Sequence, residues 1–140
     1  MQLRTSVTKG TLTGLKVLWE LAKVIVPAMV VVNVLDKAGV LPYLSRALGP
    51  VMGLFGLPGE GALVLVSANF VSFYAGLATL MALTLTWKQI TILSAMMMIC
   101  HGAIYETAMV ARAGARAGWV LGTRVVAMIA TGLILNGVLR

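Results

Sequence analysis

The apolar stretch from Ile90 to Ala111 constrains the chain most, because it is long enough to cross a bilayer yet carries polar and ionisable groups in its interior. A spanning helix needs about 20 mainly apolar residues to cross a hydrocarbon layer about 30 Å thick. Inside this stretch stand His101, Tyr105 and Glu106. Such groups are costly in hydrocarbon and are generally retained for a function. The stretch therefore predicts a membrane helix that carries a functional site.

The composition indicates a membrane setting for the whole chain. Hydrophobic residues make up 60% of the 140 residues and charged residues only 11%, unlike a water-soluble domain. The net charge of +7 comes from Lys and Arg scattered at segment ends, where they bind lipid headgroups; no nucleic-acid partner is predicted. The polar residues 1–14 form an N-terminal or interfacial segment without the pattern of a cleavable signal peptide. The membrane domain is expected at residues 15–140.

Hydropathy and backbone breaks divide the chain into five segments, and a glycine-rich turn separates the second segment from the third. Residues 39–55 are too short to span and contain two prolines, which predicts an interfacial or re-entrant helix. The turn at 56–61 reads GLPGEG and is the clearest backbone break. The remaining segments predict an all-α integral membrane protein with four transmembrane helices, at residues 15–35, 61–85, 90–111 and 117–139, the first of which can extend back to Ser6.

The basic residues are divided almost evenly between the two sides of the membrane in this topology. Of the eleven Lys and Arg, six fall on one side and five on the other. A crossing at 39–55 would change the division to seven against four. An even division gives little preference for one orientation. It favours insertion both ways and assembly as an antiparallel homodimer.

Residues 48–83 read LGPVMGLFGLPGEGALVLVSANFVSFYAGLATLMAL and are followed by TWKQITIL and HGAIYETAMV. This pattern resembles the nucleoside recognition, or Gate, family, and the likeness covers residues 15–139. The family's domain appears doubled in the membrane part of bacterial ferrous-iron transporters and is similar to the repeat of concentrative nucleoside transporters. Stand-alone versions include the spore maturation proteins A and B.

The resemblance implies a multi-pass protein of the bacterial inner membrane. In the family's transporters two such units face each other with inverted topology, and re-entrant hairpins and broken helices meet near the midplane. This chain has a single Gate-type repeat, so a second inverted copy is expected. That copy is either the chain itself, as an antiparallel homodimer, or a paralogous membrane subunit.

Glu106 is the strongest candidate for the site, because an unpaired carboxylate in hydrocarbon is costly or becomes protonated. It could coordinate a cation, carry a proton or bind a polar solute; alternatively, it pairs with Arg124 on the next helix as a structural bridge. His101 and Tyr105 share a helix face, and His101 could accept a proton or donate to a solute. On a continuous helix Glu106 is offset from His101 by about 140°, so the two need not bind the same ligand.

The motif SANFVSFYAG at residues 67–76 predicts a helix broken at membrane depth, which would free backbone groups for a ligand. Ser67, Asn69 and Ser72 would then line a polar cavity, although small hydroxylated residues also serve ordinary helix packing in membranes. Glu60 is either a turn residue at the interface or a ligand at a hairpin tip.

A cluster of soft donors on one helix raises the question of a metal. These residues, Met96, Met97, Met98, Cys100 and His101, could hold a thiophilic ion, but Met also fills irregular apolar gaps, and the metal stays undetermined. No cofactor is predicted. No nucleophile with a base, no nucleotide loop and no metal-hydrolase spacing occurs, so the chain is predicted not to be an enzyme. The leading hypothesis is a transport-type unit for a small polar, nucleoside-like solute or a cation; the alternative is a non-transporting membrane scaffold.

Overall fold

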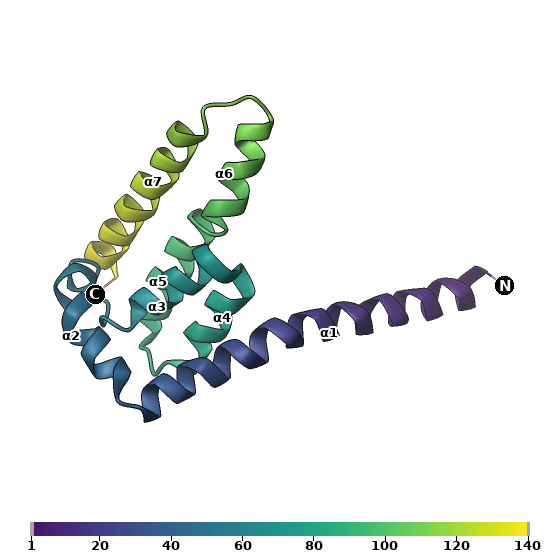
Figure 1. Ribbon diagram of the computed structural model, residues 1–140, viewed down its shortest axis with the longest axis horizontal. Helices are drawn as coiled ribbons and strands as arrows, with labels where there is room; N and C mark the ends of the chain where they lie inside the picture. Colours follow the sequence, from purple (N-terminus) through teal and green to yellow (C-terminus); the bar gives the residue numbers. More distant parts are fainter. Residues whose placement is uncertain (1, 140) are drawn as a thin grey trace.

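The computed structural model describes residues 2–139 and is helical throughout, with no strand in that range (Figure 1). Side chains are described from Lys9 onward, apart from those of Val24, Ala28, Val32, Asp36, Leu41, Leu44, Ile104, Tyr105 and Arg140. The elements in chain order are α1 (Gln2–Lys37), α2 (Val40–Gly53), α3 (Gly61–Val66), the π-helical turn η1 (Ser67–Val71), α4 (Phe73–Ala82), α5 (Trp87–Ile99), α6 (Ala103–Arg112) and α7 (Ala117–Val138).

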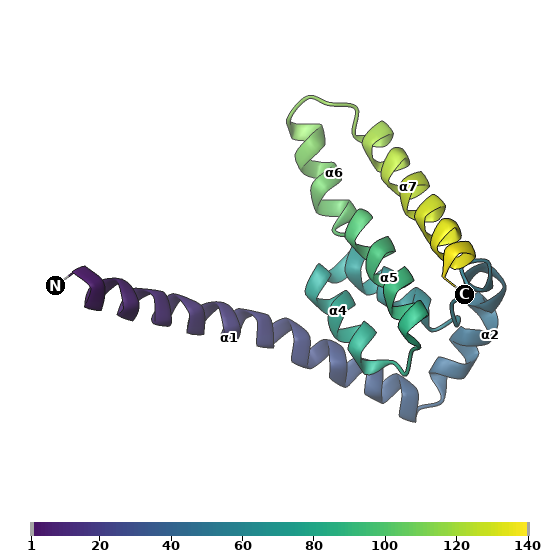
Figure 2. The same cartoon turned by 180° about the vertical axis from the view of Figure 1, so that it is seen from behind.

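Helix α1 is one continuous helix through the predicted first crossing and the residues before it, as the extension back to Ser6 predicted. Its segment Lys9–Leu35 is long and apolar enough to cross a membrane. The second half packs against α4 and α2, whereas the first half extends away from the other helices (Figures 1 and 2). Large side chains such as Leu15 and Trp19 are therefore exposed along it.

Helix α2 fits the predicted short segment at 39–55. Its 14 residues rise about 21 Å, less than the hydrocarbon layer of about 30 Å. The predicted turn at 56–61 follows it, and two of its glycines are needed there. Gly56 has a φ of +67° and lies against the side chain of Asn136, and Gly59 lies against the backbone of Ser45, so a Cβ at either position would clash.

The segment 61–85 is a hairpin, and the prediction of a single crossing there is wrong. The Thr79 hydroxyl donates to Ser67 Oγ at 3.2 Å, although twelve residues of straight helix would separate them by about 18 Å. A Cβ at Gly76 would lie 2.6 Å from the Cβ of Ala68 on the opposite arm. The first arm consists of α3 and η1, and α4 runs back beside it. The break predicted at 67–76 is confirmed, but it reverses the chain.

The stretch 90–111 also differs from its prediction, because it forms two helices. Helix α5 begins with a capping box formed by Thr86 and Gln89 and ends at Ile99, and α6 starts at Ala103 after Gly102 in the left-handed conformation. Helix α7 then runs back beside both (Figures 1 and 2). Its 22 residues are long and apolar enough to cross a membrane, so the described residues contain two such helices, α1 and α7, where four were predicted.

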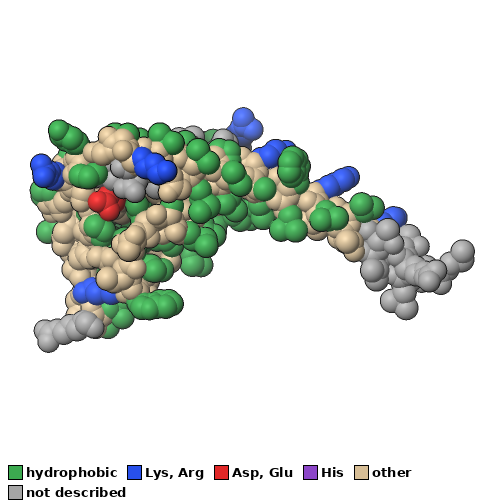
Figure 3. Space-filling model, turned by 90° about the horizontal axis from the view of Figure 1, so that it is seen from below, with side chains coloured by type: hydrophobic (Ala, Val, Ile, Leu, Met, Phe, Trp, Pro, Cys, Tyr) green, Lys and Arg blue, Asp and Glu red, His purple; other side chains and the backbone are tan. Residues whose placement is uncertain are grey.

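The core lies between the hairpin, α5 and the turn after α2. Its largest fully buried side chains include Val64 of α3 and Ile92, Leu93, Met96 and Met97 of α5. Met96 and Met97 are thus packing residues, and the described residues contain no group of three His, Cys, Asp or Glu that could hold a metal. Hydrophobic side chains also cover much of the outer surface (Figure 3), which fits a protein surrounded by lipid.

Candidate functional site

The tip of the hairpin and the break between α5 and α6 meet in space. The Gly102 amide donates to the Ala68 carbonyl at 3.1 Å, which joins the two interruptions directly. Gly102 has a φ of +58°, a conformation that glycine adopts without steric cost. Two helices that are far apart in sequence are therefore interrupted at the same place.

The hairpin tip is shaped by its own polar side chains. Ser72 is extended, and its hydroxyl accepts a hydrogen bond from the Ala75 amide at 3.1 Å, which caps α4. The Asn69 amide donates to the Leu65 carbonyl at 2.8 Å. Ser67 accepts from Thr79 across the hairpin. The three residues predicted to line a polar cavity are thus gathered at the tip, where each also holds the backbone in shape.

The end of α5 leaves backbone carbonyls without helical partners, and two side chains bind them. His101 Nδ1 lies 3.1 Å from the Met98 carbonyl, and Arg124 Nε–H of α7 donates to the Ile99 carbonyl at 3.2 Å. The His101 ring also contacts the Phe73 ring of the hairpin edge-on, with centroids 5.4 Å apart. The break is therefore held from both α7 and the hairpin.

Glu106, in the first turn of α6, connects these two side chains. Its Oε2 forms an ion pair with Arg124, and its Oε1 lies 3.5 Å from His101 Nε2. A carboxylate in the first turn is also favoured by the helix dipole. The side chain of Glu106 remains 39% exposed and that of His101 36%. The offset of about 140° between His101 and Glu106 on a helical wheel does not apply, because Gly102 breaks the helix between them. The break brings the two side chains together.

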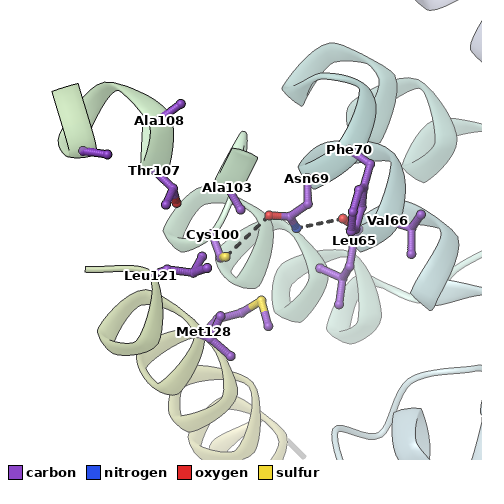
Figure 4. Close-up of a pocket in the computed structure, with 12 residues that line it drawn as sticks. Leu65, Val66, Asn69, Phe70, Cys100, Ala103, Thr107, Ala108, Leu121 and Met128 are labelled. Carbon is purple, nitrogen blue, oxygen red and sulfur yellow. Dashed lines mark hydrogen bonds between the residues drawn. The ribbon is translucent and has the colours of Figure 1, made fainter. Parts of the chain in front are cut away.

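Cys100 adds a contact that the sequence did not suggest. Its thiol is buried and lies 3.5 Å from Asn69 Oδ1 (Figure 4), which joins the break to the hairpin a second time. The signal that could have located the break is Gly102, a glycine inside an apolar helical pattern.

One predicted site residue, Glu60, is not part of this arrangement. Glu60 precedes the first residue of α3, so it lies at the base of the hairpin, with the whole first arm between it and the tip. The side chain of Tyr105 lies outside the described residues. Arg124, considered as a structural partner for Glu106, is found in that position.

Two interrupted helices joined at a cluster of ionisable side chains, together with an apolar exterior, define a membrane protein with an internal polar site. The Gate family, described as nucleoside recognition, matches residues 18–119, and the chain belongs to that family. It is also similar to "Uncharacterized membrane protein YvoD" of Bacillus subtilis (strain 168), with 38% identity over 127 residues, which are 91% of this chain and 41% of the relative. The chain thus spans about two fifths of that relative's length. No solved structure matches the chain.

Proposed function

We propose that the chain is a transport-type membrane protein, a half-sized unit that pairs with a second, inverted unit to recognise and translocate a small polar solute or a cation. The observation that carries the proposal is the meeting of two interrupted helices beside Glu106, His101 and Arg124. Irregular backbone at membrane depth is tolerated where it lines a cavity or is buried in protein. Interrupted helices of this kind form the solute and ion sites of many transporters.

The cluster offers complementary chemistry to a nucleoside-like solute or to a cation. A carboxylate accepts hydrogen bonds from hydroxyl or amide groups or coordinates a cation, and an imidazole can donate or accept. Because Glu106 and His101 are each more than a third exposed, a ligand can reach them from the open side. In this proposal Arg124 holds Glu106 in place until a ligand replaces it.

Pairing with a second unit would complete the cavity around the hairpin tip. The relative in Bacillus subtilis is more than twice as long as the part this chain matches, which leaves length for a further unit. The hairpin also changes the charge division. With crossings by α1, by α5 with α6, and by α7, and with Arg124 left out because it belongs to the site, six basic residues fall on the N-terminal side. In the described part of the chain three fall on the other side, Lys37, Arg46 and Lys88. This division favours one orientation, and with it a paralogous partner over an inverted copy of the same chain.

Uptake into proteoliposomes tests the function. The wild type and Glu106→Gln are compared against a panel of nucleosides and monovalent and divalent cations, with Glu60→Gln as the matched control away from the site. A hydrogen bond to a charged group contributes about 1.5–3 kcal/mol, so Glu106→Gln should lower uptake by at least about tenfold. Equal uptake by wild type and Glu106→Gln would rule out the carboxylate as a ligand.

Crosslinking in lipid tests the pairing. Single cysteines are placed at opposite ends of α7 in a Cys100→Ala background, which removes the chain's one native thiol. Crosslinks between opposite ends show an inverted copy of the same chain. A single orientation without self-crosslinks points to a paralogous subunit, and parallel self-crosslinks contradict the inverted arrangement.

A non-transporting membrane scaffold is the second candidate, and the closed ion pair between Glu106 and Arg124 favours it. In a scaffold this pair only fastens α6 to α7. Glu106→Gln would then leave any partner complex intact. Neither the wild type nor Glu106→Gln would transport solute into proteoliposomes.

A further inference from the structure

A separate cavity of about 710 Å³ opens beside the site, between the hairpin tip, α6 and α7 (Figure 4). Asn69 and Phe70 line it from the hairpin, Ala103 and Ala108 from α6, and Met128 from α7. Its volume falls within the range of about 300–1,000 Å³ that is common for ligand pockets. Glu106 and Arg124 are not among its lining residues, so the cavity is distinct from the ionisable cluster.

The lining of this cavity suits an apolar ligand. The side chains that carry a heteroatom are Asn69, Cys100, Thr107 and the thioether of Met128, and the first two are bonded to each other. A polar solute would therefore lose its hydration without gaining partners. A hydrocarbon chain has no hydrogen bonds with water to lose when it enters the cavity.

The position and shape of the cavity match one leaflet of a bilayer. Helix α7 is long enough to span, which places its first residue, Ala117, near one membrane surface. Along α6 the cavity extends from Ala103 to Ala111, a rise of about 12 Å, and one leaflet of hydrocarbon is about 15 Å deep. Phe70, which lines the cavity, is 65% exposed, so the cavity reaches the exterior of the protein, where lipid chains lie.

Two arginines lie in the chain between the cavity and this membrane surface, although neither lines the cavity. Arg112 ends α6, next to the lining residue Ala111, and Arg116 precedes α7, where it lines a neighbouring groove with Trp119; both are exposed. Trp119, in the first turn of α7, is also exposed, as is usual at the headgroup level. We propose that this cavity binds one acyl chain of an anionic phospholipid, with the headgroup phosphate on Arg112 and Arg116.

Native mass spectrometry of the delipidated full chain tests the proposal with phosphatidylglycerol and phosphatidylcholine of identical chains. Each basic residue near an anionic headgroup contributes about fivefold in affinity, so the double change Arg112→Gln with Arg116→Gln should weaken phosphatidylglycerol binding by roughly 30-fold. Phosphatidylcholine, whose phosphate charge is balanced by its choline group, should lose much less affinity. Ala108→Trp, which fills the cavity, should abolish specific binding of both lipids. Ala130→Trp, on the opposite face of α7, is the matched control and should bind as the wild type does.

A second variant keeps the test decisive if Ala108→Trp does not fold. Val125→Phe narrows the same cavity from α7 and should also lower lipid binding. A photoreactive benzoylphenylalanine at position 108 should form an adduct with lipid. Phosphatidylglycerol binding that is unchanged in either cavity variant, or in the arginine variant, overturns the proposal. An adduct with a second copy of the chain also overturns it, because the occupant would then be protein.

Discussion

Replacing Gly76 by alanine is expected to force apart the two arms of the hairpin formed by α3, η1 and α4. A Cβ at this position would lie 2.6 Å from the Cβ of Ala68, 2.9 Å from its Cα and 2.8 Å from Met97 Sδ. The methionine can move, but Ala68 belongs to the backbone of the opposite arm. The arms must therefore separate, and the bond between Thr79 and Ser67 across them must lengthen.

The size of the effect follows from overpacking. One added methyl group in a tightly packed interior costs about 1–3 kcal/mol. Unfolding entropy is about 2.1 cal/mol/K per residue in globular proteins, or roughly 0.3 kcal/mol/K for a chain of this length. The Tm of Gly76→Ala should therefore fall by about 3–10 °C.

The chain supplies its own probe for this measurement. Cys100 is its one cysteine and is 3% exposed, so a thiol-reactive fluorophore reports unfolding in detergent as the temperature rises. Gly122→Ala is the matched control, because nothing lies within 4 Å of the added Cβ and alanine favours the helix. A Tm of Gly76→Ala equal to that of the wild type would falsify the close approach of the two arms.

Two further changes test contacts within the fold by the same assay. Thr79→Val removes the hydroxyl that joins the hairpin arms. Interhelical hydrogen bonds in membranes average about 0.6 kcal/mol, so the Tm should fall by roughly 2 °C. The control Thr123→Val loses only hydrogen bonds within α7 and should not change the Tm. Asn136→Ala removes the hydrogen bond to the Leu54 carbonyl and should lower the free energy of unfolding by about 1 kcal/mol. The control Asn33→Ala, which loses only a hydrogen bond within its own helix, should have little effect. An equal loss of stability in the two variants would contradict the link between α7 and the turn after α2.

Hydropathy and turn chemistry were sufficient to predict the membrane class, the C-terminal end of α1 to within two residues, the bounds of α7 and the turn at 56–61, whereas α1 begins at Gln2 and not at Ser6 or Leu15. They also predicted a break at 67–76, because polar residues interrupt an otherwise apolar run there. They could not show that the chain reverses at this break. A periodic pattern records which faces are apolar, and the two arms of a hairpin carry the same pattern as one straight helix.

The candidate site was predicted in part. Glu106 and His101 were selected for their cost in hydrocarbon, and they lie together in the structure, but the helical wheel separated them. That calculation assumed a continuous helix, and one left-handed glycine at 102 changes the direction of every side chain after it. The contact between Cys100 and Asn69 depends on the hairpin, so no local pattern could predict it.

The hairpin also affects what gene duplication can produce. In the topology proposed above, both of its arms open to the same side, and the crossings that remain, by α1, by α5 with α6, and by α7, are odd in number. The two ends of such a chain emerge on opposite sides of the membrane. If two copies of its gene were fused head to tail, the second copy would begin where the first ended and would insert upside down without any change of sequence. A chain with an even number of crossings would need an added linker helix to reach the same arrangement.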